Sequence, residues 1–316
     1  MFYTALLLDD IHINAIDLLK HHNFNVIHYP DHTKNKILEI IDKVDVIIYR
    51  LFSTTIDGEI LSKAKNLKCI IRTGAGMGNI DFAVATKNKV IIMDTRHCNS
   101  FSAAEFIFGS ILNLARKITL GDKFFRSGKF ERNSLWGTEL AGKTLGIIGF
   151  GHIGKNVCKM ATSFNMKVIS FSPHITPDEI KAYLIENVTL DELFRNSDFI
   201  SIAFPGTLND LGMINKEKIN LMKTGVYLIN ASSMGVFNYD DVADALKSGK
   251  IGGLVIDRPS FDPAIETHQF LDFPNVIFSP TLGSHTHEGQ TRCVTQAINQ
   301  AIDYLDNGVI SNQILR

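Results

Sequence analysis

Short apolar runs alternate with helix-like stretches along most of the chain. In the first 98 residues the runs are ALLL, FNVIHY, VDVIIY, LKCII and VIIM, and the spacing between them leaves room for crossover helices. A second series begins with TLGIIGF and continues through MKVISF, DFISIAF, GVYLIN, GGLVID and NVIFSP. Near-continuous apolar strands of this kind belong to parallel sheets that are covered on both faces. The pattern therefore predicts an α/β protein whose second sheet is doubly wound.

Two further segments carry apolar residues at helical spacing without a strand run inside them. The stretch from Ser100 to about Ile118 begins with capping residues and predicts one long helix that leaves the first domain. The stretch EGQTRCVTQAINQAIDYLDNG ends on the stop signal Gly308, and we expect it to pack on the first domain. Residues 119–143 are polar and carry Gly121, Gly128 and Gly137, which predicts an irregular arm.

Length, composition and charge limit the possible functions. A chain of 316 residues with 45% hydrophobic and 21% charged residues predicts two folded domains. A formal net charge of -1 offers no overall positive field for nucleic acid or anionic lipid. The start MFYTALLLDD does not resemble a signal peptide, and no apolar run approaches the roughly 20 residues that span a bilayer. We expect a cytoplasmic protein that binds small molecules and neither nucleic acid nor membranes.

The cysteines are few and widely spaced. They are Cys69, Cys98, Cys158 and Cys293, with no CxxC pair among them. This spacing predicts reduced structural thiols and no metal site.

A glycine-rich turn marks the most specific motif. Gly149, Gly151 and Gly154 in GFGHIG follow a predicted strand and begin a predicted helix. In a dinucleotide-binding turn the first glycine allows the tight bend, the second lets the backbone approach a pyrophosphate, and the third permits close packing of helix on strand. The helix N-terminus then faces the phosphate charge. The alternative is a glycine-rich turn without a ligand, and the position between strand and helix favours the dinucleotide site.

The residue that would discriminate between NAD and NADP is a serine. About 20 residues beyond the glycines, an acidic residue usually binds the adenosine ribose of NAD. Here the strand ends in SFSPH, with Ser172 at that point. A serine can bond the ribose but does not repel a 2′-phosphate, and no arginine is adjacent to bind one. We predict NAD as the cofactor, with NADP not excluded.

Several blocks resemble those of the D-isomer-specific 2-hydroxyacid dehydrogenases, and most closely the D-3-phosphoglycerate dehydrogenase branch. RTGAGMGNID resembles the substrate loop of the family, and TELAGKTLGIIGFGHIGKNV resembles its nucleotide-binding segment. Later blocks are similar in DELFRNSDFISIAFPGTLNDLGMIN, LMKTGVYLINASSMGV and GKIGGLVID. The resemblance implies a flavodoxin-like substrate domain of residues 1–98 and 284–316, a Rossmann NAD(P)-binding domain of residues 99–283, a cleft at the hinge, and a homodimer.

The resemblance also implies sets of binding residues. The implied cofactor contacts are Gly149, Gly151, His152, Ile153, Gly154, Ser172, Pro205, Thr207, Ala231, Asp257 and Gly283. Arg50 and Arg72 end predicted strands of the first domain and match family positions that contact substrate. We expect the backbone N–H groups of Gly74, Ala75 and Gly76 to bind a carboxylate as a nest of donors.

The resemblance implies hydride transfer between a nicotinamide and a 2-oxo acid, and this chain departs from the family at two catalytic positions. The family uses a histidine as proton donor, an acidic residue that orients it, and an arginine that binds the substrate carboxylate. Ser233 stands at the arginine position and Thr281 at the histidine position, whereas Asp262 keeps the acidic one. A serine has no cationic fork and a threonine cannot donate a proton as an imidazolium does, so reduction of ordinary 2-oxo acids should be slow or absent.

Other charged residues are candidates to compensate. His285 lies four residues beyond Thr281 and is the alternative proton donor. Further candidates for the cleft are Arg258, Arg96 and His97. We predict an NAD(P)-dependent oxidoreductase with altered catalytic residues, acting on a 2-oxo or 2-hydroxy acid. The alternatives are a dinucleotide-binding sensor or scaffold of the same fold, and a different reaction that uses Ser233 or Thr281 as a hydrogen-bond donor.

Overall fold

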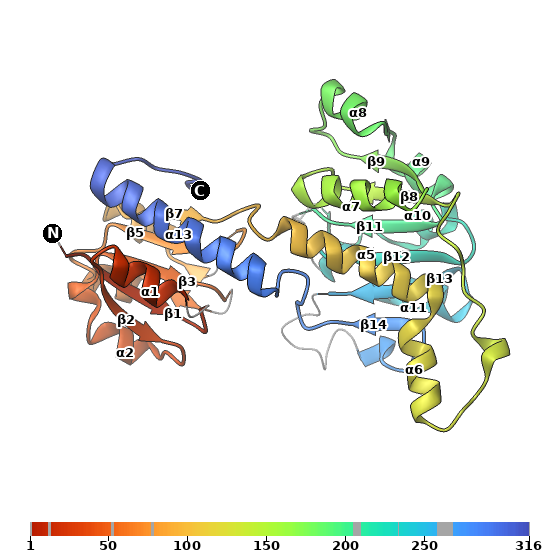
Figure 1. The fold of residues 1–316 in the computed structure, drawn as a ribbon, viewed down its shortest axis with the longest axis horizontal. Coiled ribbons are helices and arrows are strands. Elements are labelled where there is room, and N and C mark those ends of the chain that lie inside the picture. The colour runs from red at the N-terminus through yellow and green to blue at the C-terminus, as the bar shows by residue number, and fades with distance from the viewer. Residues whose placement is uncertain are drawn as a thin grey trace. The chain divides into compact units, whose positions relative to one another are not determined.

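The chain is divided into two compact units (Figure 1). The first unit contains residues 1–99 and 285–316, and the second contains residues 100–284, so the chain crosses between them twice. The computed structural model describes residues 2–11, 14–51, 54–76, 79–204, 210–232, 234–257 and 268–315. Within these ranges, no helix has the length and apolar character that crossing a membrane requires.

The first unit is built on a parallel five-stranded sheet in the order β2-β1-β3-β5-β7. Its strands are β1 (Thr4–Leu8), β2 (Asn25–Tyr29), β3 (Val46–Tyr49), β5 (Cys69–Arg72) and β7 (Ile91–Asp94), beside a small sheet of β4 (Thr55–Ile56) and β6 (Asn79–Ile80). Its helices are α1 (Asn14–His21), α2 (Lys34–Leu38), η1 (Ile41–Lys43), α3 (Gly58–Lys63), α4 (Phe82–Lys87) and α13 (His287–Asn307). This strand order is that of flavodoxin-like folds, as the sequence predicts.

Helices cover both faces of the first sheet. One apolar core contains Ile37, Ile60 and Leu61 from α2 and α3. The opposite core contains residues of α1 together with Val294 and Ile298 of α13, the last helix of the chain. Figure 1 shows α13 running beside α1 over this face. The sheet can be buried on both sides only because residues from both ends of the chain contribute to it.

The second unit contains a parallel seven-stranded sheet in the order β10-β9-β8-β11-β12-β13-β14. Its strands are β8 (Thr144–Ile148), β9 (Lys167–Phe171), β10 (Glu186–Asn187), β11 (Phe199–Ile202), β12 (Val226–Asn230), β13 (Ile251–Ile256) and β14 (Val276–Phe278). Its helices are α5 (Ser100–Arg116), α6 (Ile118–Arg126), η2 (Arg132–Ser134), α7 (His152–Ser163), α8 (Pro177–Tyr183), α9 (Leu190–Asn196), α10 (Lys216–Leu221), η4 (Met234–Val236), α11 (Tyr239–Lys247) and η5 (His268–Phe270).

The two faces of this sheet carry separate apolar cores. Helices α5 and α7 bury Ile111 and Val157 on one face, whereas α9, α10 and α11 bury Leu193, Ile219 and Val242 on the other. The strand order reverses direction at β8, which makes the sheet doubly wound. The predicted fold class is confirmed.

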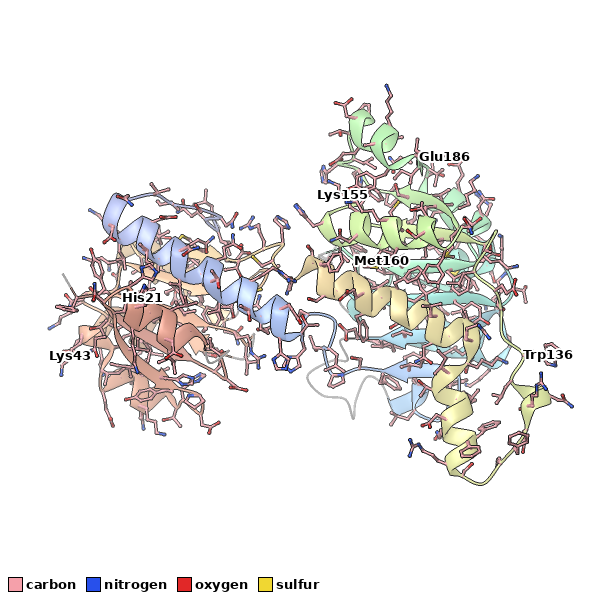
Figure 2. The ribbon with its side chains drawn as sticks, in the orientation of Figure 1. His21, Lys43, Trp136, Lys155, Met160 and Glu186 are labelled. Atoms are coloured by element: carbon pink, nitrogen blue, oxygen red, sulfur yellow. The ribbon has the colours of Figure 1, made fainter. Side chains whose placement is uncertain are left out.

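The segment after α5 differs from the sequence prediction. The expected single helix to Ile118 ends at Arg116, because Lys117 adopts a left-handed conformation with φ of 52°. A second helix, α6, then occupies part of the stretch expected to be irregular, and none of its side chains is buried. The arm, defined here as residues 118–139, leaves Phe125, Phe130 and Trp136 between 71% and 86% exposed. Figure 2 shows Trp136 on the part of the arm that follows α6.

Candidate functional site

The glycine turn between β8 and α7 is shaped by close approaches of its backbone. Gly149 has a φ of 94°, a conformation that residues with a Cβ rarely adopt. A Cβ placed on Gly154 would lie 2.4 Å from the carbonyl oxygen of Gly149, so α7 can pack this tightly only with glycine there. These are the tight-turn and close-packing roles that the sequence assigns to the two residues.

The middle glycine borders open space. Apart from the glycine and its two chain neighbours, no described residue has an atom within 4 Å of a Cβ built on Gly151, which is the N-cap residue of α7. The first turn of α7 carries no acidic residue. The helix N-terminus therefore offers a positive partial charge and room beside the backbone, which fits the pyrophosphate of a dinucleotide. The predicted contacts His152 and Ile153 are the first two residues of this helix.

Ser172 follows β9 and is held by an asparagine from the neighbouring strand. The Asn187 Oδ1 atom accepts from the Ser172 N–H at 3.1 Å, and its Nδ2 donates to the Ser172 carbonyl at 3.3 Å. Beside them lies a pocket of about 810 Å³. Its lining residues are Phe171, Ser172, Pro173, Ile180, Ile185, Glu186, Asn187, Val188, Thr189 and Glu192.

The charge of this pocket bears on the choice of cofactor. Two of its lining residues are the carboxylates Glu186 and Glu192, and the lining contains neither arginine nor lysine. Hydrogen bonds from Thr189 lower the pKa of Glu192, so this group stays ionised near neutral pH. Glu186 pairs with Lys167 at 3.4 Å, so its charge is matched, but the lining offers no arginine or lysine to bind a 2′-phosphate, which agrees with NAD.

Asp257 fixes the loop that carries Thr281. Its carboxylate accepts from Ser279 Oγ at 2.7 Å, from the Leu282 N–H at 2.8 Å and from the Gly283 N–H at 3.0 Å. Burial raises the pKa of this carboxyl, and the three hydrogen bonds act in the opposite direction. The side chain thus positions the loop 279–283 through all three donors.

Thr281 adopts an unusual backbone conformation. Its φ is 62°, which is an outlier for a β-branched residue. Its N–H donates to the carbonyl of Asp257 at 2.6 Å and to that of Ser279 at 2.9 Å, and its side chain is exposed. The contacts made by Asp257 maintain this strained conformation.

In the first unit, Arg50 follows β3 beside Asp9. The buried Asp9 carboxylate accepts from the backbone N–H groups of Arg50 and Leu51, each at 2.8 Å. The guanidinium Nη1 of Arg50 lies 3.5 Å from Nδ1 of His285. Because arginine only donates, His285 Nδ1 must act as the acceptor, and a neutral ring then carries its proton on Nε2. The Nε of Arg50 is buried and has no hydrogen-bond partner in the described part of the chain.

Arg72 holds the glycine loop that follows β5. Its Nε donates to the Arg50 carbonyl at 3.2 Å, and its Nη1 donates to the Ala75 carbonyl. The Gly74 N–H donates to Thr95 Oγ1 at 2.7 Å, and the Gly76 N–H donates to Asp94 Oδ2 at 2.9 Å. Two of the three amides expected to bind a carboxylate are therefore engaged within the protein, and a ligand would need these bonds to open.

The remaining predicted residues divide into three groups. Ala231 follows β12 and packs against the core beneath α5 and α7, and Gly283 is held by Asp257. Arg96 pairs with the Asp94 carboxylate at 2.6 Å, so its charge is already matched within the first unit. Outside the described residues lie Ser233, Asp262, Pro205, Thr207 and Arg258.

Sequence reasoning assigned no role to Asp9, Asn187 or Ser279, which orient Arg50, Ser172 and the loop of Thr281. The signal for Asp9 was present, since an acidic pair follows the first apolar run directly. Ligand sites of parallel sheets gather at the carboxyl ends of the strands, and Asp9 lies just after β1. Asn187 and Ser279 carry no such signal, because each acts through a contact between distant parts of the chain. Among the described residues, no group of three or more His, Cys, Asp or Glu side chains could hold a metal ion.

A doubly wound sheet with an open glycine turn at a helix N-terminus defines a dinucleotide-binding protein, and comparisons with known proteins specify its family. Residues 108–283 match the model of the D-isomer specific 2-hydroxyacid dehydrogenase NAD binding domain. The chain is 36% identical to a hydroxypyruvate reductase of Thermotoga maritima over 261 residues, which cover 82% of this chain and 84% of the relative.

Two further comparisons agree. The chain is 31% identical to a D-3-phosphoglycerate dehydrogenase of Sus scrofa over 303 residues, covering 95% of this chain but only 56% of that relative. The structure of a D-2-hydroxyisocaproate dehydrogenase has the same fold, with a TM-score of 0.90, 23% identity and coverage of 98% of this chain and 99% of the other. The protein belongs to the D-isomer-specific 2-hydroxyacid dehydrogenase family and carries its NAD-binding domain. The predicted family and the predicted cofactor, NAD, are confirmed.

Proposed function

We propose that the protein is an NAD-dependent oxidoreductase that interconverts a 2-hydroxy acid and the corresponding 2-oxo acid. The observation that carries this proposal is the open space beside Gly151, at the N-terminus of α7 within the family's NAD-binding domain. Bound NAD would supply the hydride acceptor at its nicotinamide ring. In this proposal the discontinuous first unit is the substrate domain and the second unit is the NAD-binding domain.

Arg50 is our candidate for binding the substrate carboxylate. It combines a permanent charge with a buried Nε that has no partner among the described residues, and its backbone is fixed by Asp9. A guanidinium can donate two parallel hydrogen bonds to a carboxylate. Arg72 already donates hydrogen bonds to the carbonyls of Ala75 and Arg50. Its role in this proposal is therefore to hold the loop 73–76 and to position Arg50.

His285 is our candidate for the proton donor. Ser233 and Thr281 stand where the family resemblance places an arginine and a histidine, and neither can replace the original group chemically. His285 is exposed, and its contact with Arg50 leaves the proton of the neutral ring on Nε2. Protonation of Nδ1 would break the contact with Arg50, and the resulting imidazolium could donate its Nε2 proton to a carbonyl oxygen that becomes an alkoxide, which leaves a neutral ring.

For the substrate class we propose small 2-oxo acids with a polar group at C3. The names of two relatives, hydroxypyruvate reductase and D-3-phosphoglycerate dehydrogenase, support this class. The chain spans little more than half the length of the D-3-phosphoglycerate dehydrogenase that it matches. The cationic Arg50 provides the charge complementarity that a carboxylate or phosphate would need.

The deciding experiment separates binding from turnover. Thermal shifts with NAD, NADH, NADP and NADPH come first, followed by a screen of 2-oxo acids that includes hydroxypyruvate and 3-phosphohydroxypyruvate. A ligand at 100 times its dissociation constant should stabilise the fold by about 2.7 kcal/mol. We expect NAD and NADH to shift the melting midpoint and at least one acid to oxidise NADH. If no dinucleotide stabilises the protein, the proposal is wrong.

A second candidate function is a dinucleotide-binding sensor or scaffold. It is supported by Thr281, whose exposed, strained loop offers no ionisable group at the histidine position. Binding of NAD without turnover of any acid in the same screen would favour this candidate over the enzyme.

We further propose that the protein is a cytoplasmic homodimer in which the arm covers a second copy. The support is the apolar surface of Phe125, Phe130 and Trp136, each exposed by more than 70%. Side chains of this size rarely remain so exposed together unless another surface covers them. The four cysteines are free, as the reducing cytoplasm would keep them.

A further inference from the structure

Two of the four cysteines meet within the first unit. Cys98 lies next to the first crossing of the chain, at residues 99–100, and Cys293 lies in the second turn of α13, soon after the second crossing. Their side chains are hydrogen-bonded to each other. The Cys98 thiol also contacts Gln296 Oε1, and the Arg292 Nε donates to the Cys98 carbonyl at 2.9 Å. These contacts attach Cys98 to the first half of α13.

The two thiols have unequal environments. Cys98 is partly exposed, whereas Cys293 is 1% exposed. The hydrogen bond from Cys293 lowers the pKa of Cys98 to about 7, and the nearby Arg292 charge acts in the same direction. Conversely, the hydrogen bond with Cys98, followed by burial, raises the pKa of Cys293. Cys98 is thus the thiol that ionises first, and the thiolate is the nucleophilic form.

The other two cysteines provide an internal contrast. Cys69 and Cys158 are almost completely buried. Burial raises the pKa of Cys69, and it raises that of Cys158 to about 11. Neither should be reactive near neutral pH.

We propose that Cys98 and Cys293 form a peroxide-reactive dithiol that closes reversibly to a disulfide, joining the chain that enters the second unit to the helix that follows its exit. This goes beyond the sequence expectation of four structural thiols. The proposal is independent of the substrate and of the proton donor, because neither the site of Arg50 nor the glycine turn takes part in it.

The chemistry takes two balanced steps. The Cys98 thiolate attacks one oxygen of hydrogen peroxide, the O–O bond breaks, and the released hydroxide takes up a proton to leave as water, giving Cys98 sulfenic acid. The Cys293 sulfur then attacks the sulfenic sulfur, and its proton leaves with the displaced hydroxide as a second water. Two thiols lose two electrons in total, and peroxide gains them. A dithiol reductant reverses the reaction by exchange.

Closure would have a mechanical consequence. All of residues 100–284 would lie inside the covalent loop between Cys98 and Cys293. A crosslink across so long a loop restricts the unfolded chain, so the oxidised protein should melt at a higher temperature than the reduced one.

The test uses the full chain, reduced and then treated with hydrogen peroxide. Thiol titration should show the loss of two of the four thiols. Peptide mass spectrometry without reductant should reveal one crosslink, between Cys98 and Cys293, that dithiothreitol removes. In Cys293→Ser the Cys98 thiol should stop at the sulfenic acid, which dimedone traps, whereas Cys158→Ala should behave like the wild type.

A second measurement keeps the proposal testable if Cys293→Ser does not fold. In the wild-type protein at pH 7, iodoacetamide should alkylate Cys98 at least tenfold faster than Cys158, and prior oxidation should block this labelling. Equal alkylation rates, or peroxide oxidation that produces no Cys98–Cys293 crosslink, would overturn the proposal.

Discussion

At the scale of single residues, the second unit offers an uncrowded glycine and the first unit offers a charged side chain. Gly151 faces open space at the N-terminus of α7, and Arg50 retains a donor without a partner among the described residues. The motif around Gly151 was predictable from local sequence, because strand, glycines and helix follow one another directly. The pairing of Arg50 with His285 was not, because 235 positions separate the two residues along the chain.

Gly151→Val should abolish dinucleotide binding and leave the apo protein folded. The added side chain would enter the open space beside the α7 N-terminus, where we place the pyrophosphate, and its Cβ would meet no described residue beyond its chain neighbours within 4 Å. Calorimetry with NADH should show at least a tenfold loss of affinity, about 1.4 kcal/mol. Gly109→Val is the matched control, because a Cβ at this exposed position of α5 also meets no atom within 4 Å. Unchanged affinity in Gly151→Val would refute the assignment.

His285→Ala should reduce turnover of a 2-oxo acid by about a hundredfold, the lower end for loss of a general acid. Its affinity for NADH should not change. His287→Ala, two residues further on at the start of α13, serves as the control and should retain activity. Equal rates for His285→Ala and the wild type would exclude His285 as the proton donor.

The double variant Ser233→Arg with Thr281→His is the complementary test. It restores a carboxylate-binding cation and an imidazole at the two family positions. We expect kcat/KM on a 2-oxo acid to rise by at least tenfold. If NADH still binds and turnover does not increase, the rest of the site no longer supports this reaction.

At the scale of elements, two buried carboxylates in the loops after strands fix the position of neighbouring loops. Asp9 after β1 and Asp257 after β13 each hold a neighbouring loop through several hydrogen bonds. The apolar runs predicted the strands themselves, since continuous burial leaves a clear pattern. The sequence could not predict these carboxylate contacts, because they join residues about 25 to 42 positions apart.

The strained backbone of Thr281, in the loop held by Asp257, can be tested by substitution. Thr281→Asn should raise the free energy of unfolding by about 0.5–1 kcal/mol, because asparagine tolerates the left-handed conformation better than a β-branched residue does. Denaturant unfolding would measure the change. The control is Thr138→Asn, because Thr138 has an ordinary φ and its replacement should give no such gain. Thr286→Asn would not serve as a control, because Thr286 caps α13. A loss of stability in Thr281→Asn would mean that its φ is not strained in solution.

Helix α6 shows where sequence prediction failed at this scale. Its apolar and charged residues do lie on opposite sides of the helix, although none of its side chains is buried. The polar composition and Gly121 outweighed this signal and pointed to an irregular arm. The helix formed nonetheless, and the dimer that we propose would cover its unburied apolar side chains.

At the scale of the whole molecule, we predict that the protein is a dimer at micromolar concentration and that the arm is responsible. Replacing Phe125 and Trp136 together with serine should shift light scattering toward the monomer mass, because both side chains are highly exposed. The paired replacement Leu184→Ser and Leu211→Ser, also exposed but outside the arm, should leave the mass unchanged. A wild-type monomer under these conditions would contradict the prediction.

The place of α13 in the first unit has a consequence for synthesis. The face of the first sheet that α1 only partly covers is completed by Val294 and Ile298, residues near the end of the chain. During translation the second unit emerges as one continuous stretch and can fold at once, since domains generally fold as units from the N-terminal side. The first 99 residues, although made earlier, must wait with an apolar face uncovered until residues 285–316 leave the ribosome. Of the two units, the one whose synthesis begins earlier is therefore the one that is completed later, and in the interval its uncovered apolar face must not aggregate.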